Sequence, residues 1–169
     1  MKRARTTYAN GAQMAHVLAA LMPTNALIVK LCMQTGLRIS DVLELRTCEL
    51  KRRQTVRESK TGKTRRIQWP AGLYEQMQEQ AGKYWVFEGR TDRKKHRQRQ
   101  TVWKDIKRAE KGFKRSGALT KSQNLGTHSA RKFAAVTAYQ RGGMKAAQKM
   151  LNHSDPMITR LYALADKEV

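Results

Sequence analysis

The chain has 169 residues, of which 35 are Lys or Arg and 13 are Asp or Glu, giving a formal net charge of +22. Hydrophobic residues make up 40% of the sequence, enough for one sizeable core, and no apolar run reaches the roughly 18 residues that a membrane span needs. A small domain needs a net charge of only about 2–8 for solubility. The excess indicates a polyanionic partner, and nucleic acid fits better than a membrane surface.

Cysteine usage and the N-terminus indicate a cytoplasmic protein. Cys32 and Cys48 lie in apolar helical patterns, which favours buried, reduced thiols. Because no further cysteine or paired histidine stands at metal-ligand spacing, the sequence predicts no metal site and no cofactor. Residues 1–10 are basic but lack the apolar stretch of a secretory signal. We expect one domain over residues 1–169, with a basic extension over about residues 1–10.

Hydrophobic spacing predicts a mainly helical domain with a small antiparallel β-hairpin near its middle. Two β-rich runs, 54–59 and 64–70, flank KTGK, which places Gly62 in a turn. Gly36 and Gly142 are expected to end helices. A short apolar strip at 84–87 precedes a polar, basic loop at 88–99. The helices are expected at 11–21, 23–34, 39–46, 73–80, 101–117, 128–142, 144–151 and 156–166.

Six side chains stand where a helical domain has no structural need of them. Each has an ordinary interpretation when taken singly: a helix-end cation, a turn lysine, a solvated helix face, a loop histidine or a core tyrosine. Their order and spacing along the chain make them candidates for one site. They are Arg38, Lys60, His128, Arg131, His153 and Tyr162.

This arrangement resembles the tyrosine recombinase (phage integrase) family, whose catalytic set runs Arg, Lys, His-x-x-Arg, His or Trp, and Tyr. TGLRISDVLEL resembles the first box of the family, SKTGKTRRIQWP its lysine hairpin, THSAR its second box and LNHSDPMITRLY its third. The resemblance covers about residues 12–165. It implies the catalytic-domain fold of the family, mainly α with a small antiparallel sheet, and a site-specific DNA recombinase of a phage or mobile element.

The sequence departs from the family pattern in several places. Asn152 stands where glycine is common, Ala130 where leucine is usual, and Lys132 where histidine is frequent. Asn is the next-best residue for a left-handed turn, so we expect the turn to persist. The N-terminal DNA-clamping domain of most relatives is expected to be absent. Only seven residues follow Tyr162, which is short for the tail that relatives dock onto a neighbouring subunit.

The resemblance implies a role for each candidate residue. Arg38 and Arg131 would bind the non-bridging phosphate oxygens in place of a metal, with His153 as a third donor. Tyr162 would attack and form a 3′-phosphotyrosyl link, so that religation needs no ATP. Lys60 would protonate the 5′-oxygen. Two residues have supporting roles: His128 as acid or base, and Asp41 to orient Arg38, although a plain helix-face carboxylate fits Asp41 equally well.

The expected partner is double-stranded DNA, bound by a free monomer that self-associates on DNA, as a tetrameric synapse. Basic residues on the hairpin and in the loop are expected to contact the phosphate backbone, which fixes register without reading sequence. These residues are Lys63, Arg65, Arg66, Arg93, Lys94, Lys95, Arg97 and Arg99.

Other readings stay open at this point. A type IB topoisomerase shares the nucleophile, arginines and lysine, but typically lacks the histidine seen here as His128. A catalytically silent DNA-binding regulator would not need all six residues. A phage or mobile-element integrase is the first choice, a stand-alone inversion recombinase is the runner-up and an excised fragment of a longer integrase is the third possibility, and the sequence does not separate them.

Overall fold

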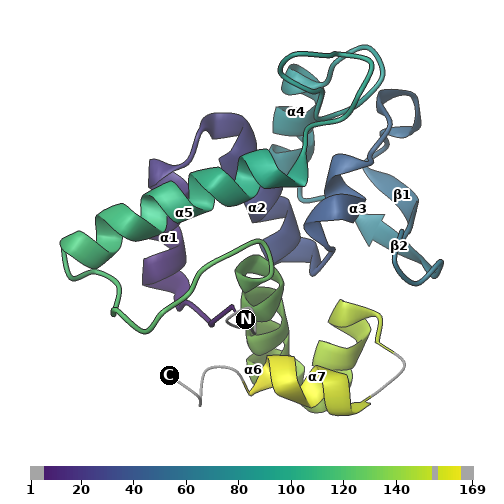
Figure 1. The fold of residues 1–169 in the computed structure, drawn as a ribbon. Helices are drawn as coiled ribbons and strands as arrows, with labels where there is room; N and C mark the ends of the chain where they lie inside the picture. Colours follow the sequence, from purple (N-terminus) through teal and green to yellow (C-terminus); the bar gives the residue numbers. More distant parts are fainter. Residues whose placement is uncertain (1–5, 154–155, 165–169) are drawn as a thin grey trace.

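The computed structural model describes residues 6–153 and 156–164 (Figure 1). Within these ranges the fold is mostly helical with one two-stranded antiparallel sheet, which confirms the expected fold class. The elements are α1 (Gly11–Ala20), α2 (Pro23–Thr35), α3 (Ile39–Leu43), a 3₁₀ turn (Thr47–Glu49), β1 (Arg53–Arg57), β2 (Thr64–Gln68), α4 (Ala71–Gln80), α5 (Arg99–Arg115), α6 (Ser129–Leu151) and α7 (Pro156–Ala163).

Local signals explain where the first two helices begin and end. Asn10 and Gln13 form a reciprocal capping box at the start of α1, with N–O distances of 2.9 and 3.1 Å. Pro23 occupies the first turn of α2, where its missing N–H costs nothing. Gly36 ends α2 in the left-handed conformation, at φ 65°. The predicted bounds of both helices are therefore confirmed to within a residue or two.

The third helix is shorter than the pattern predicted, ending at Leu43 rather than at residue 46. The backbone that follows pairs with the apolar strip at 84–87 instead. The amide of Val86 donates to the carbonyl of Leu45 at 2.9 Å, and the amide of Thr47 donates to that of Tyr84 at 3.1 Å. The strip thus takes the hydrogen bonds that a longer helix would have used.

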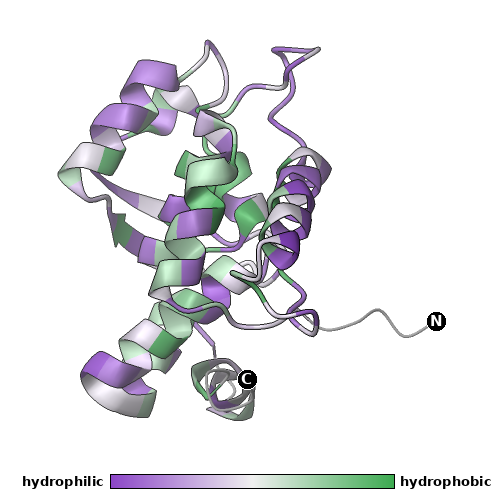
Figure 2. Ribbon diagram, turned by 90° about the vertical axis from the view of Figure 1, so that its left-hand side faces the viewer, coloured by the Kyte–Doolittle hydropathy of each residue, from purple (hydrophilic) through white to green (hydrophobic). Residues whose placement is uncertain are grey.

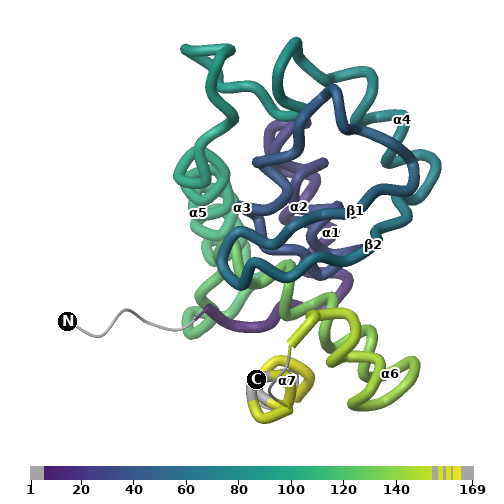
Figure 3. The backbone as a smooth tube through the Cα atoms, turned by 90° about the vertical axis from the view of Figure 1, so that its right-hand side faces the viewer, coloured from purple at the N-terminus to yellow at the C-terminus, as the bar shows by residue number. Residues whose placement is uncertain are grey.

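The hairpin has one face turned toward the helices. Arg53 pairs with Gln68 and Arg57 with Thr64, and Gly62 in the turn has φ 67°. Val56 and Ile67 are buried, while their neighbours along each strand are more exposed. Figure 3 shows the hairpin lying across the helical body, with α7 below it. The hairpin is thereby positioned to bring its turn to the same side as α7.

The long helix α6 consists of two segments. Gly142 and Gly143 have non-helical dihedrals, with φ 66° and ψ −162° at Gly143. The predicted stop at Gly142, followed by a second short helix, is therefore confirmed. The second segment ends at Asn152, which adopts the left-handed conformation at φ 53°. This turn sends the chain into α7, which packs against α6.

The core is formed by the apolar faces of the helices and the inner face of the hairpin, with Trp69, Phe87 and Leu31 almost fully buried. The face of helix α5 that points away from the core is strongly hydrophilic (Figure 2). The expectation of two buried thiols is half right. Cys32 is buried, and burial raises the pKa of its thiol to about 12. Cys48 is exposed, because it lies in the 3₁₀ turn rather than in a helix.

Candidate active site

All six candidate residues line one cavity of about 410 Å³. Arg38 comes from the loop between α2 and α3, Lys60 from the turn of the hairpin, and His128 from the start of α6. Further lining residues include Ser40, Thr61, Lys63, Arg99, Thr127 and Asn152. The cavity is therefore built where six separate segments of the chain meet, and the charged side chains of its lining are Arg and Lys.

Arg131 is the most deeply buried cation of this cavity, at 2% exposure. Its guanidinium donates to the carbonyl of Gly36, to the carbonyl of Leu151 at 2.7 Å and to Nε2 of His153 at 3.0 Å. Burial and then the charge of Arg38 lower the pKa of Arg131 to about 10. The group still carries its charge at neutral pH, and its position is fixed by the ends of α2 and α6.

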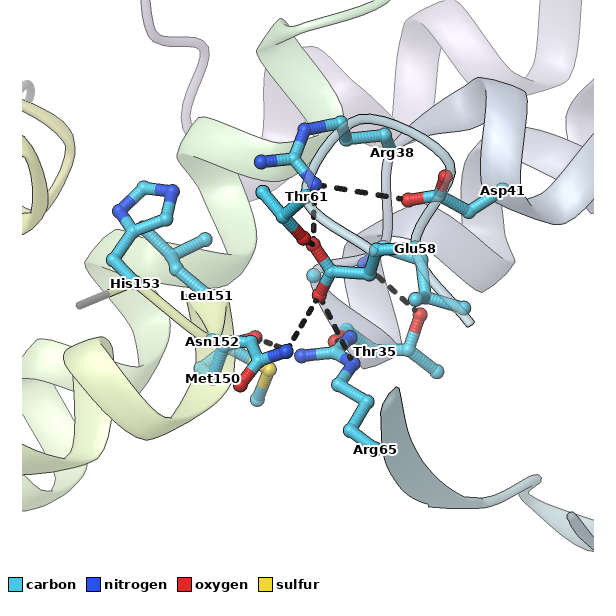
Figure 4. Close-up of polar contacts among 12 residues, drawn as sticks. Thr35, Arg38, Asp41, Glu58, Thr61, Arg65, Met150, Leu151, Asn152 and His153 are labelled. Atoms are coloured by element: carbon cyan, nitrogen blue, oxygen red, sulfur yellow. Dashed lines mark hydrogen bonds and ion pairs between the residues drawn. The ribbon is translucent and has the colours of Figure 1, made fainter. Parts of the chain in front are cut away.

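Arg65 is largely buried at the same two helix ends as Arg131. The sequence suggested a DNA backbone contact, but only 12% of the Arg65 side chain is exposed. Its guanidinium donates to the carbonyls of Thr35 and Met150, one at the end of each helix. Arg65 (Figure 4) and Arg131 thus each connect the end of α2 to the end of α6. The cause is strand alternation, which turns Arg65 to the same face as Ile67.

Gly36 allows the two helix ends to approach each other. A Cβ at this position would lie 2.7 Å from the carbonyl oxygen of Met150, and the left-handed φ of 65° disfavours any other residue. The carbonyl of Gly36 also accepts the bond from Arg131. The glycine of the first box is therefore required by packing as well as by the helix stop.

Two buried carboxylates support the cationic cavity. Asp41 accepts hydrogen bonds from the amide (3.0 Å) and hydroxyl (2.8 Å) of Ser59, and its second oxygen lies 3.9 Å from Nη1 of Arg38. The hydrogen bonds that Asp41 makes therefore go to the hairpin, and its orienting role toward Arg38 stays a prediction. Glu58, fully buried, accepts from Arg38 (Figure 4). The sequence analysis missed Glu58, although it lies two residues from buried Val56 and so on the same face.

The two histidines of the cavity are neutral at pH 7 in the free chain. Burial first, and then Arg131 and Arg38, lower the pKa of His153 to about 4. Burial followed by Arg99 and Arg131 also lowers the pKa of His128. Because an arginine can only donate, the Nε2 of His153 that faces Arg131 is an acceptor and its proton sits on Nδ1. The ring of His153 meets the ring of Tyr162 edge to face, with centroids 5.7 Å apart.

The remaining residues predicted to contact DNA fall into four groups. Lys63 and Arg99 line the cavity, and Arg66 is exposed on β2. Arg97 is buried instead, donating to Oδ1 of Asn25 at 2.8 Å, so its main contact is internal. The exposed group on the loop before α5 is Arg93, Lys94 and Lys95, away from the cavity lining.

Two further observations concern only the described residues. No group of three or more His, Cys, Asp or Glu side chains there is placed to hold a metal ion. None of the described helices is both long and apolar enough to cross a membrane.

Solved structures share this fold at low sequence identity. The neighbours include residues 75–356 of lambda integrase, as a dimer bound to a COC′ core site, with a TM-score of 0.80 and 19% identity over 96% of this chain and 61% of that one. They also include the XerH recombinase bound to difH substrate, at 0.69 and 17% over 92% and 50%. The Tn1549 transposon integrase matches at 0.74 and 17%, over 95% and 62%. The chain spans about half to three fifths of the length of these structures.

The architecture is that of a tyrosine recombinase catalytic domain. The model of the phage integrase family matches residues 8–168, so the chain belongs to the phage integrase family. None of the curated proteins compared by sequence matches the chain.

Proposed function

We propose that this chain is the catalytic part of a site-specific DNA recombinase that cuts and rejoins DNA through a 3′-phosphotyrosyl link at Tyr162. The observation that carries the proposal is that all six residues of the family pattern line one cavity. Tyr162 lies in α7 and His153 precedes that helix, yet the centroids of their rings are 5.7 Å apart. Chance placement of unrelated surface residues does not produce this convergence.

The cavity offers a phosphate several fixed positive charges. Arg38 and Arg131 would each donate to the non-bridging oxygens, where charge grows in the transition state. Three of the five N–H groups of Arg131 are engaged by described residues, which leaves two for phosphate. Since the guanidinium positions are fixed before DNA arrives, little reorganisation is needed during the reaction. In this proposal, arginines supply the charge that a metal supplies in other nucleases.

Proton transfer falls to the hairpin lysine and the histidines. Lys60 is exposed at the turn and reaches into the cavity, which suits a donor that approaches the leaving 5′-oxygen. Burial lowers the pKa of His153 most, and a bound phosphate would offset the further lowering by Arg131 and Arg38. The imidazole of His153 would then take a proton on Nε2, and this nitrogen would change from a hydrogen-bond acceptor to a donor. His128, half-buried beside Arg99, would assist as acid or base.

The substrate we propose is double-stranded DNA. Its phosphates would neutralise part of the net charge of +22. The lambda and XerH structures contain bound DNA, and one lambda structure is a tetramer on a Holliday junction. By analogy we propose that several copies of this chain assemble on DNA from a monomeric free state, and that the chain acts as a single catalytic domain in the cytoplasm.

The deciding experiment is covalent trapping on a nicked suicide substrate. The wild-type chain should form a 3′-linked protein–DNA adduct, and Tyr162→Phe should bind the same DNA without forming one. Binding without any wild-type adduct would instead identify a silent DNA-binding regulator. Relaxation of supercoiled DNA by single molecules, with no strand exchange, would favour a topoisomerase over a recombinase.

A further inference from the structure

One buried carboxylate connects three segments of the active site. Glu58 has no exposed surface, and it precedes the hairpin turn that carries Lys60. One of its oxygens accepts from Nη1 of Arg38 and lies 3.3 Å from the hydroxyl of Thr61. The other accepts from Nδ2 of Asn152 at 3.1 Å (Figure 4). Glu58 does not line the cavity, so it stands behind the residues that would meet phosphate.

The backbone of Glu58 also closes the hairpin turn. Its amide donates to the carbonyl of Lys63 at 2.8 Å, and its carbonyl accepts from the amide of Gly62 at 2.8 Å. A shift of Glu58 would therefore move the turn on which Lys60 is mounted. Glu58 thus sets both the position of Arg38 and the position of the hairpin.

Asn152 supplies the third connection. It has φ 53°, a conformation that favours glycine, and glycine would give the same turn without a side chain. The side-chain amide of Asn152 donates a hydrogen bond to Glu58, and the next residue in the chain is His153. The turn that carries His153 is thus bonded to the hairpin rather than only to its own helix.

Electrostatics gives the Glu58 carboxylate a second reason to be there. The cations around it are Arg38 and Arg65, which are half-buried, and Arg131, which is buried. Nε of Arg65 lies 3.9 Å from Oε1 of Glu58. Burial opposes ionisation of Glu58, but the bonds from Asn152 and Arg38 outweigh it and the pKa is lowered. Glu58 is therefore a fixed negative charge that holds like-charged arginines together before any phosphate is bound.

We propose that Glu58 and Asn152 form a positioning clamp that aligns Arg38, the Lys60 hairpin and the His153 turn for the reaction, a role that rests on the proposed function. Glu58 touches no substrate, so removing it should slow the chemical step without weakening DNA binding. Loss of one hydrogen bond to a charged group corresponds to a rate decrease of roughly 10- to 100-fold.

The test compares Glu58→Gln and Asn152→Gly with Glu110→Gln. Glu110 is a buried carboxylate of α5, held by Lys107 and Lys114 outside this cavity, so the control makes the same change of charge. Adduct formation should slow for Glu58→Gln by roughly 10- to 100-fold and less for Asn152→Gly, whereas all three variants bind DNA at least as tightly as wild type. Rates within twofold of the Glu110→Gln rate would overturn the proposal.

A second measurement separates the clamp from the proposed function. Amide hydrogen exchange at Gly62 in the free protein should accelerate in Glu58→Gln and Asn152→Gly but not in Glu110→Gln. If wild-type protein forms no adduct, the proposed function fails while exchange still decides the clamp, and unchanged exchange rejects it. Asn152→Gly suits the left-handed turn and should fold, so it decides the question alone if Glu58→Gln does not fold.

Discussion

Acid should destabilise this protein through His153, whose pKa is lowered from 6.5 to about 4 by burial, then by Arg131 and Arg38. Between these two values the unfolded chain binds a proton that the folded chain excludes. Stability from this group is therefore complete above pH 6.5 and is lost as the pH falls toward 4. At about 1.4 kcal/mol for each pH unit, the loss between pH 7 and pH 5 is about 2 kcal/mol.

The assay is urea unfolding of wild type and His153→Gln at both pH values. Glutamine keeps an acceptor for Arg131 but does not titrate, and the other titrating groups cancel in the difference between proteins. Wild type should lose about 2 kcal/mol more than the variant on acidification. The same pH dependence in both proteins would show that burial and the neighbouring arginines do not hold the histidine neutral, and the donor-switching step proposed for His153 would lose its basis.

Further perturbations test other parts of the reasoning. Lys60→Ala should slow cleavage of ordinary DNA far more than cleavage of a substrate with a 5′-bridging sulfur, which leaves without a proton; equal loss on both would exclude Lys60 as the acid. Gly36→Ala should destabilise the fold by at least about 1 kcal/mol, because of its φ of 65° and the 2.7 Å approach to Met150, as measured by thermal or urea unfolding. EDTA should leave adduct formation unchanged, since arginines supply the charge; loss restored by Mg²⁺ would contradict this. The slope of log K for DNA against log salt should lie at about −5 to −9, from roughly 6–10 phosphate contacts; a slope near zero would remove the polyanion argument.

Much of the fold was predictable because helix ends carry their own signals. Gly36 and Asn152 adopt the left-handed conformation that most side chains disfavour, Gly142 is followed by Gly143 at φ 66°, and each of these sites ends a helical segment in the structure. The length of α3 was not predictable, because the competing partner strip lies some forty residues further along the chain. The local hydrophobic pattern cannot show whether the backbone after Leu43 continues the helix or pairs with the strip at 84–87.

The residues that line the cavity were predictable from the sequence, but the buried residues behind them were not. Spacing along the chain pointed to the residues that now line the cavity. The burial of Arg65 was not predicted and Glu58 was overlooked, because charged residues usually face solvent. Alternation within each strand did carry the signal, since Arg65 shares a face with Ile67 and Glu58 follows Val56 by two. A charged residue on the apolar face of a hairpin therefore indicates a buried partner.

The junction of α2 and α6 has a consequence for interpreting variants of the arginines. Peptide dipoles leave partial negative charge at the carboxyl end of a helix. Here two such ends converge, and Arg131 binds one carbonyl from each. The dipoles favour the charged guanidinium that faces the cavity, so the scaffold itself tunes the phosphate receptor. Replacing Arg131 would remove one of the two arginines that bridge these helix ends and leave Arg65 to offset their negative charge. A loss of activity at this position therefore reports on architecture and chemistry together, unless folding is measured alongside it.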